Sequence, residues 1–131
     1  MAALADSPVV AFVATVQPHA ARSFYRDALG LPLRSEDDYA LVFGLAGTSL
    51  RVAKVKSFTP QPFTVLGWNV VDLAATLHEL VERGVEPMRV DGIPQDARGV
   101  WTTPNGAQVV WFKDPDGNTL SITELAKPEG A

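Results

Sequence analysis

The sequence predicts an α+β fold made of two tandem copies of one β-α-β-β-β module. A short β-branched stretch followed by an amphipathic helix that ends at glycine occurs twice, at residues 9–30 and 64–84. Three extended stretches follow each helix, so the whole pattern repeats. The composition, 47% hydrophobic and 20% charged, is that of a globular chain able to bury a core.

The first module begins with Val9–Val16, whose β-branched residues predict a buried strand. Pro18 suits the first turn of a helix because its missing N–H costs nothing there, and Gly30 ends that helix. The apolar face of the helix contains Tyr25, which we expect to lie in the core. The strands predicted next are Leu31–Glu36, Tyr39–Leu45 and Thr48–Val55.

The second module begins with the strand Thr64–Val70. Asp72 is a good N-cap for the following helix, and Gly84 ends it. The strands predicted next are Glu86–Val90, Ala107–Lys113 and Thr119–Leu125, and the turn DPDGN closes the last hairpin.

These elements predict one domain over residues 1–131. Module 1 covers about 9–56, a connector covers 57–63, module 2 covers about 64–125, and a tail covers 126–131. The second module is longer because it contains the loop Asp91–Gly106. We place Trp101 on that loop, where it could close over a site.

Charge and composition argue against several classes of partner. The net charge is −4 with a pI near 5.0, and no cluster of Lys and Arg is present, so nucleic acid and anionic membranes are not expected partners. The chain has no cysteine and no long apolar run. Its first residues lack the positively charged region of a secretory signal, so we do not expect one. We therefore expect a soluble cytoplasmic protein.

Three segments together, ARSFYRDALGLPL, VDLAATLHELVERGVEP and WFKDPDGNTLSI, resemble the vicinal oxygen chelate (VOC) superfamily. This superfamily includes glyoxalase I, the bleomycin-resistance proteins and the extradiol dioxygenases. The resemblance implies two curved half-barrel sheets around a cleft. In the metal enzymes of the family, the first and fourth strands of each module supply His, Glu or Gln ligands to a divalent ion.

The resemblance assigns those four ligand positions to Val10, Arg51, Val65 and Ser121. Valine has no lone pair to donate, and a neutral serine is a poor sole ligand. Arg51 would repel a cation: at about 4 Å and an effective dielectric of 20, two unit charges repel by roughly 4 kcal/mol. We therefore expect no metal, no other cofactor and no catalytic residue.

The histidines give no second ligand set. His19 and His78 both fall within predicted helices, so we expect structural or solvent-edge roles for them. Trp68 points away from Gly67 and Asn69 by strand alternation and is expected in the core.

Strand alternation instead predicts an apolar and aromatic ligand site with a few polar groups. It would suit a flat organic ligand with an acceptor or acidic group. The predicted ligand-binding residues are Trp101, Trp111, Arg51, Asn69, Phe12 and Ser121.

Several of these residues could instead have a purely structural role. The two tryptophans could be core or dimer contacts, and Asn69 a satisfied polar group of the sheet. Arg51 could pair with a surface carboxylate such as Glu36 or Glu124.

The function predicted from these features is metal-independent binding of an aromatic or amphipathic small molecule, as in antibiotic sequestration. The alternative is a glyoxalase-like lyase, isomerase or dioxygenase with unusual or absent metal ligands. A third interpretation is an interaction protein whose role is dimerisation. We expect a homodimer in any case, because a second copy would cover open sheet edges.

Overall fold

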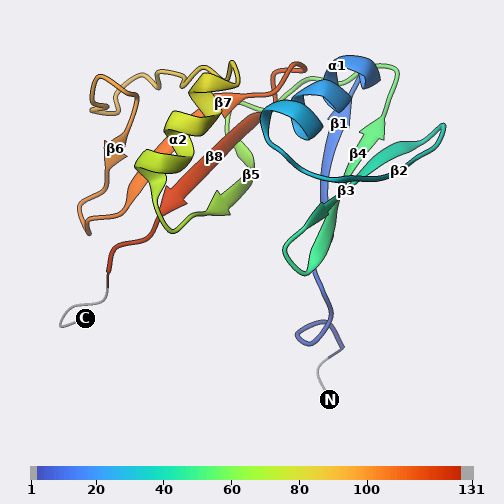
Figure 1. The fold of residues 1–131 in the computed structure, drawn as a ribbon, viewed down its shortest axis with the longest axis horizontal. Helices are drawn as coiled ribbons and strands as arrows, with labels where there is room; N and C mark the ends of the chain where they lie inside the picture. Colours follow the sequence, from blue (N-terminus) through green and yellow to red (C-terminus); the bar gives the residue numbers. More distant parts are fainter. Residues whose placement is uncertain (1–2, 128–131) are drawn as a thin grey trace. The chain divides into compact units, whose positions relative to one another are not determined.

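The computed structural model describes residues 3–127, so residues 128–131 of the predicted tail lie outside it. The chain divides into two compact units, Met1–Thr59 and Pro60–Ala131, called unit 1 and unit 2 here. The boundary falls inside the predicted connector, residues 57–63. Each unit contains one four-stranded sheet (Figure 1).

The two sheets have the same topology. Unit 1 has the strand order β1-β4-β3-β2, and unit 2 has the order β5-β8-β7-β6. The first strand of each unit pairs in parallel with the last, and the other pairs are antiparallel. This repetition confirms the predicted α+β fold of two modules. The strands are β1 (Ala11–Thr15), β2 (Leu33–Glu36), β3 (Ala40–Leu45), β4 (Thr48–Lys54), β5 (Thr64–Asn69), β6 (Trp101–Thr102), β7 (Gln108–Lys113) and β8 (Thr119–Glu124).

The helix of unit 1 begins as predicted but widens near its end. Helix α1 (Pro18–Ser23) continues into a π-helical turn, η1 (Phe24–Ala28), in which the Leu29 amide donates to the Phe24 carbonyl at 2.9 Å. Within this turn Tyr25 is fully buried, as the sequence predicted, and contacts the ring of Phe43 at a centroid distance of 5.7 Å. The aromatic contacts thus hold the widened turn on the sheet.

Helix α2 (Leu73–Glu82) of unit 2 is capped from two parts of the chain. The side chain of Asp72 accepts a hydrogen bond from the Ala75 amide at 3.0 Å, which confirms the predicted N-cap. Glu124, at the end of β8, accepts from the Leu73 amide at 2.9 Å. The second bond ties the start of the helix to the sheet beneath it.

Each sheet has one face covered by helix and one open face. In unit 1 the covered side chains are fully buried, among them Leu41, Phe43, Leu50 and Val52. In unit 2 the corresponding side chains are Val110, Phe112, Leu120 and Ile122. Since strand side chains alternate, their neighbours in sequence are left for the open face.

The prediction of a strand over Glu86–Val90 is wrong. Only Pro87 makes a bridge, to Phe112, and the Met88 amide bonds to the Trp111 carbonyl at 2.8 Å. The fourth strand of the sheet is instead completed by β6, within the segment predicted as a loop. Pro87 lacks an N–H, which favours a short bridge over a continuous ladder. Residues 89–100 therefore leave the sheet edge and return to it.

The DPDGN turn is organised by a buried carboxylate. Asp114 accepts hydrogen bonds from the amides of Asp116 and Asn118, both at 2.9 Å, and from the Asn118 side chain at 2.8 Å. Gly117 has a φ of 89°, which favours glycine there. The segment is a turn stabilised from within, as its composition predicted.

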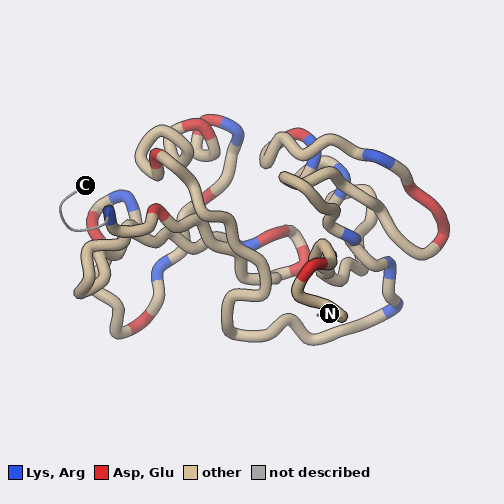
Figure 2. The backbone as a smooth tube through the Cα atoms, turned by 90° about the horizontal axis from the view of Figure 1, so that it is seen from below, with Lys and Arg blue, Asp and Glu red and all other residues tan. Residues whose placement is uncertain are grey.

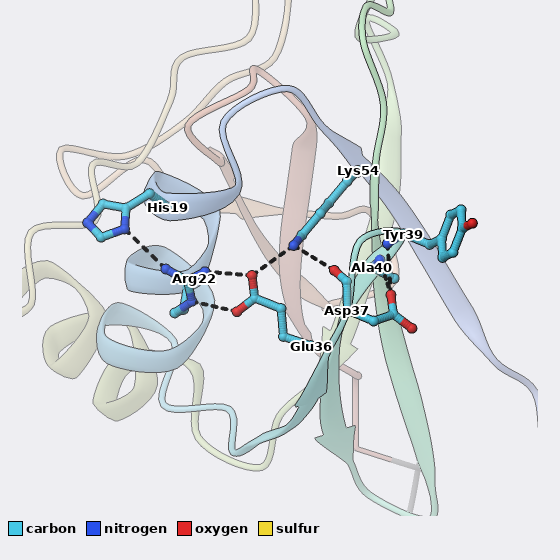
Figure 3. A network of polar contacts seen from close by, with 7 residues as sticks. All are labelled: His19, Arg22, Glu36, Asp37, Tyr39, Ala40 and Lys54. Carbon is cyan, nitrogen blue, oxygen red and sulfur yellow. Dashed lines mark hydrogen bonds and ion pairs between the residues drawn. The ribbon is translucent and has the colours of Figure 1, made fainter.

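An ion-pair network joins the helix of unit 1 to its sheet (Figure 3). Arg22 donates to both carboxylate oxygens of Glu36, at 2.9 and 2.6 Å. Lys54 donates to the same carboxylate at 2.8 Å and to the Asp37 carbonyl at 2.7 Å. The hydrogen bonds from Arg22 and then Lys54 lower the pKa of Glu36 to about 2.

Charge is distributed over the surface of both units. Acidic and basic residues are interspersed along the backbone of each unit (Figure 2). Within residues 3–127, no helix is long and apolar enough to cross a membrane.

The lowered pKa of Glu36 makes stability depend on pH. Its contribution is fully present above its ordinary pKa of 4.5 and is lost as the pH falls toward about 2. Urea unfolding between pH 5 and pH 2 should therefore show a shallower loss of stability for Glu36→Gln than for the parent. Glu86→Gln is the matched control and should keep the parental slope. Equal slopes for Glu36→Gln and the parent would contradict the network.

Candidate functional site

A groove with a volume of about 780 Å³ lies on the open face of the unit 2 sheet. Its walls come from the connector, the sheet and the segment that leaves the sheet edge. The lining residues are Pro60, Gln61, Pro62, Phe63, Thr64, Met88, Arg89, Val90, Asp91, Ile93, Trp111, Lys113, Gly117 and Thr119. A mixed apolar and polar groove of this size is large enough for a small organic molecule.

Trp111 is the aromatic residue that strand β7 presents to this groove. Its indole Nε1 donates a hydrogen bond to Thr64 Oγ1 at 3.1 Å. Its ring stacks on that of Trp101, with centroids 5.9 Å apart and an angle of 21° between the planes. These two contacts fix the ring in one orientation, so the groove has a preformed aromatic surface.

A β-bulge brings Thr64 to the same face. Thr64 pairs with Thr119, and Leu66 pairs with Leu120, so Val65 is an extra residue in β5. Without the bulge, strand alternation would turn Thr64 and Val65 to opposite faces. The bulge therefore turns Thr64 to the open face, and its hydroxyl lies beside Trp111. Simple alternation from Val65 would have turned Thr64 to the other face.

Gln95 holds the looped segment 89–100 that forms one wall. Its side-chain oxygen accepts from the Val90 amide at 2.7 Å. Its nitrogen donates to the carbonyls of Met88 and Gly99 at 2.9 and 2.8 Å. The amide group thus replaces the strand pairing that this segment lacks, and it keeps the wall in place.

Charged residues of the same segment are also tied to its backbone. The two terminal nitrogens of Arg89 donate to the carbonyls of Asp96 and Ala97, at 2.6 and 3.0 Å. The pKa of Asp96 is lowered, chiefly by a hydrogen bond from the Val100 amide and also by Arg98. Arg89 therefore lines the groove, but the terminal nitrogens of its guanidinium are bonded to these backbone carbonyls.

The predicted site residues of unit 2 do not all meet at the groove. Trp111 lines it. Trp101 lies on strand β6 and not in a loop, and it stacks on Trp111; that it covers the site stays a prediction. Ser121 lies in register with Trp111 and is only 8% exposed. Asn69 is exposed and lines a separate hollow of about 270 Å³ at the far end of β5.

Ser121 is covered by a close approach of the neighbouring strand. A Cβ added to Gly67 would lie 2.7 Å from Ser121 Oγ, so glycine leaves the space that the serine occupies. Trp111, Ser121 and Gly67 form one row across three strands. Ser121 is thus part of the floor beside the tryptophan.

The predicted site residues of unit 1 lie together on its own open face. Phe12 and Arg51 are partners in the register of β1 and β4, and Phe12 is 61% exposed. Arg51 makes no hydrogen bond or ion pair with the part of the chain that the structure describes. The pKa of Asp37 is lowered chiefly by hydrogen bonds from two backbone amides and, to a smaller degree, by the charge of Arg51.

The structural role considered for Arg51, a pairing with Glu36 or Glu124, is wrong for both carboxylates. Glu36 is occupied by Arg22 and Lys54, and Glu124 caps helix α2. The carboxylate that the charge of Arg51 does influence is Asp37, whose pKa it helps to lower.

His78 lies on the solvent side of helix α2, as the sequence predicted. Its Nε2 is 3.1 Å from a carboxylate oxygen of Glu82, one helical turn further along, and both side chains are largely exposed. His78 therefore belongs to the helix surface and not to the groove.

The side chains at the four positions that the sequence resemblance assigns to metal ligands are poor ligands for a divalent ion. Val10 and Val65 offer no donor atom, and Arg51 is cationic. Ser121 would contribute a single neutral hydroxyl. Among residues 3–127, no group of three or more His, Cys, Asp or Glu side chains could hold a metal ion.

Sequence reasoning missed several lining residues. Thr64 depends on the bulge, and Met88 on the broken edge strand, so neither could be found from strand alternation. Lys113 could have been found, because it follows Trp111 by two residues and alternation turns it to the same face.

Removing the side-chain amide that holds the groove wall should loosen the looped segment. Gln95→Ala leaves the Val90 amide without its acceptor, and three hydrogen bonds are lost. We expect faster hydrogen exchange at Val90 and a loss of roughly 1–3 kcal/mol in the free energy of unfolding. Gln108→Ala on β7 is the matched control and should leave exchange at Val90 at the parental rate. Unchanged exchange at Val90 in Gln95→Ala would contradict this role.

Comparisons with known proteins agree with this architecture. A family model described as Glyoxalase/Bleomycin resistance protein/Dioxygenase superfamily matches residues 8–122. A glyoxalase/bleomycin resistance protein from Catenulispora acidiphila DSM 44928 is 27% identical, with a TM-score of 0.69 over 90% of this chain and 97% of that one. A search of curated protein sequences finds no significant match.

Two further solved structures share the fold at lower identity. TnmS3, an antibiotic binding protein from Streptomyces sp. CB03234, is 23% identical with a TM-score of 0.69, over 94% of this chain and 99% of that one. A glyoxalase family protein from Bacillus anthracis is 16% identical with a TM-score of 0.74, over 96% and 100%. Since the family model spans most of the sequence, this chain belongs to the Glyoxalase/Bleomycin resistance protein/Dioxygenase superfamily.

Proposed function

We propose that this chain is a small-molecule binding protein that holds an aromatic or amphipathic compound in the unit 2 groove, without a metal ion. The observation that carries the proposal is the preformed aromatic surface of Trp111, fixed by Thr64 and by stacking on Trp101. A rigid ring costs little conformational entropy when a ligand stacks on it. The biological role that we propose is sequestration of such a compound, for example an antibiotic.

Two further observations support binding over catalysis. Among the lining residues, all within 3–127, there is no histidine, and the one carboxylate, that of Asp91, lies in an exposed turn. The family's metal positions carry side chains that do not suit a divalent ion, so the enediolate chemistry of the glyoxalases has no Lewis acid there. TnmS3 is an antibiotic binding protein, so the same fold serves for binding in another chain.

Unit 1 offers a second set of candidate contacts. Phe12 and Arg51 present a ring and a cation on the open face of their own sheet. Such a pair suits an aromatic ligand with an acceptor group. We propose both residues as ligand contacts of unit 1 by itself, and Ser121, in the floor beside Trp111, as a ligand contact of unit 2. Asn69 is a ligand contact of unit 2 only if a ligand extends along β5.

Loss of the tryptophan should weaken the binding of a neutral aromatic probe. We expect 2-naphthamide to bind the parent and to bind Trp111→Leu about tenfold more weakly, because stacking and buried aromatic area are lost. Isothermal titration calorimetry measures this, with thermal unfolding to show that each variant folds. Trp68→Leu, on the helix-facing side of the same sheet, is the matched control and should bind as the parent does.

Variants of the remaining residues map the extent of the surface. Trp101→Leu should weaken binding less than Trp111→Leu, because Trp101 acts by holding the other ring. Weaker binding by Arg51→Ala or Phe12→Ala would show that the open face of unit 1 also contributes to probe binding. If Trp111→Leu binds the probe as the parent does, the proposed site is wrong.

Metal independence has its own measurement. Protein purified without a chelator should contain no stoichiometric zinc, nickel, iron or manganese by elemental analysis. Treatment with a chelator should leave 2-naphthamide binding unchanged, since no donor set of the site depends on an ion. One bound metal ion per chain would contradict the proposal and favour a lyase, isomerase or dioxygenase.

The homodimer and the cytoplasmic location stay predictions. Sedimentation of the purified chain tests the homodimer.

A further inference from the structure

We propose that the unit 2 groove selects aromatic ligands that carry a carboxylate, and that Thr64, Thr119 and Lys113 hold that carboxylate. This inference rests on the proposed function and names the ligand class of the same groove. It also assigns a specificity role to three residues beside the tryptophan that forms the aromatic surface.

The three side chains form one row across the sheet. Thr64 pairs with Thr119, and Thr119 pairs with Lys113, on the adjacent strands β5, β8 and β7. Residues paired in this way point to the same face. All three line the groove together with Trp111, which precedes Lys113 by two residues on the same strand. The row therefore lies directly beside the indole.

The hydroxyl of Thr64 is directed to donate a hydrogen bond. Its oxygen accepts from Trp111 Nε1, so its own hydrogen must point to another acceptor. A hydroxyl that accepts one hydrogen bond also becomes a stronger donor. Thr119 adds a second hydroxyl that is adjacent in the row, on a residue that is only 6% exposed. The two hydroxyls favour a ligand group that accepts hydrogen bonds.

Lys113 makes the row positively charged. Its ammonium forms no hydrogen bond or ion pair with any residue in 3–127. The other cation of the groove, Arg89, has its terminal nitrogens on backbone carbonyls. Asp91 is the acidic residue among the lining residues, and it lies in an exposed turn and not on the strands of the row. Two cations and one anion give the groove a net positive charge in a chain of net charge −4.

Two hydroxyl donors and an ammonium beside a fixed aromatic surface match a planar carboxylate attached to a ring. A carboxylate offers two oxygens with about four lone-pair directions, so it can accept from neighbouring donors in the row at once. Charge-assisted hydrogen bonds of this kind are stronger than neutral ones. A neutral amide of the same shape accepts fewer bonds and brings its own donors toward the ammonium.

The test compares two probes of the same shape that differ in charge, 2-naphthoate and 2-naphthamide, by isothermal titration calorimetry on the full chain at pH 7. We expect the parent to bind 2-naphthoate about three- to tenfold more tightly than 2-naphthamide. Lys113→Gln should reduce this ratio to about one, and Thr119→Val should reduce it in part. Lys56→Gln, which removes the same charge from an exposed position of unit 1, is the matched control and should keep the parental ratio.

The outcomes separate this inference from the function on which it rests. Equal affinity of the parent for both probes, or a parental ratio in Lys113→Gln, overturns the inference alone. Tighter binding of 2-naphthylmethylamine than of 2-naphthoate also overturns it, since Asp91 would then set the selectivity. If the parent binds neither 2-naphthoate nor 2-naphthamide, the proposed function is overturned and this inference with it.

Discussion

The position of β8 between β5 and β7 is the constraint on which unit 2 depends. Its backbone pairs with β5 in parallel and with β7 in antiparallel, so its register is fixed from both sides. Leu120 and Ile122 are buried under helix α2, while Thr119 and Ser121 face the open side. A shift of one residue would exchange the two sets, turning the hydroxyls toward helix α2 and the apolar side chains toward the open face. The hydrophobic contacts under helix α2 thereby determine which polar side chains of β8 face the open side of the sheet.

The same strand also connects the helix to the candidate site. Glu124 at its end accepts from the first amide of α2, so the helix starts at a fixed point on the sheet. Unit 1 achieves the equivalent connection differently, through Arg22 and Glu36 on the surface. The two copies of the module therefore share topology but differ in the chemistry that joins helix to sheet.

The open faces of the two units also carry different residues. In unit 2 the bulge at Val65 and the broken edge strand at Pro87 reshape one face into a groove around Trp111. In unit 1 the edge strand β2 is continuous apart from one irregularity near Leu33, and the open face presents Phe12 and Arg51. Irregularities at sheet edges re-aim side chains without disturbing the core. The candidate site lies where the second copy departs from the regular pattern of the first.

Sequence patterns alone were enough to predict the duplicated α+β fold, the caps at Asp72 and Gly84, the buried Tyr25 and the faces of the central strands. These features follow from local periodicity and turn chemistry, which depend on near neighbours in the chain. Long-range packing was needed to establish that Trp101 stacks on Trp111, that Thr64 turns toward the indole and that Glu36 and Glu124 bind other groups than Arg51. Each of these depends on residues distant in sequence, or on one extra residue in a strand, and periodicity has no signal for either.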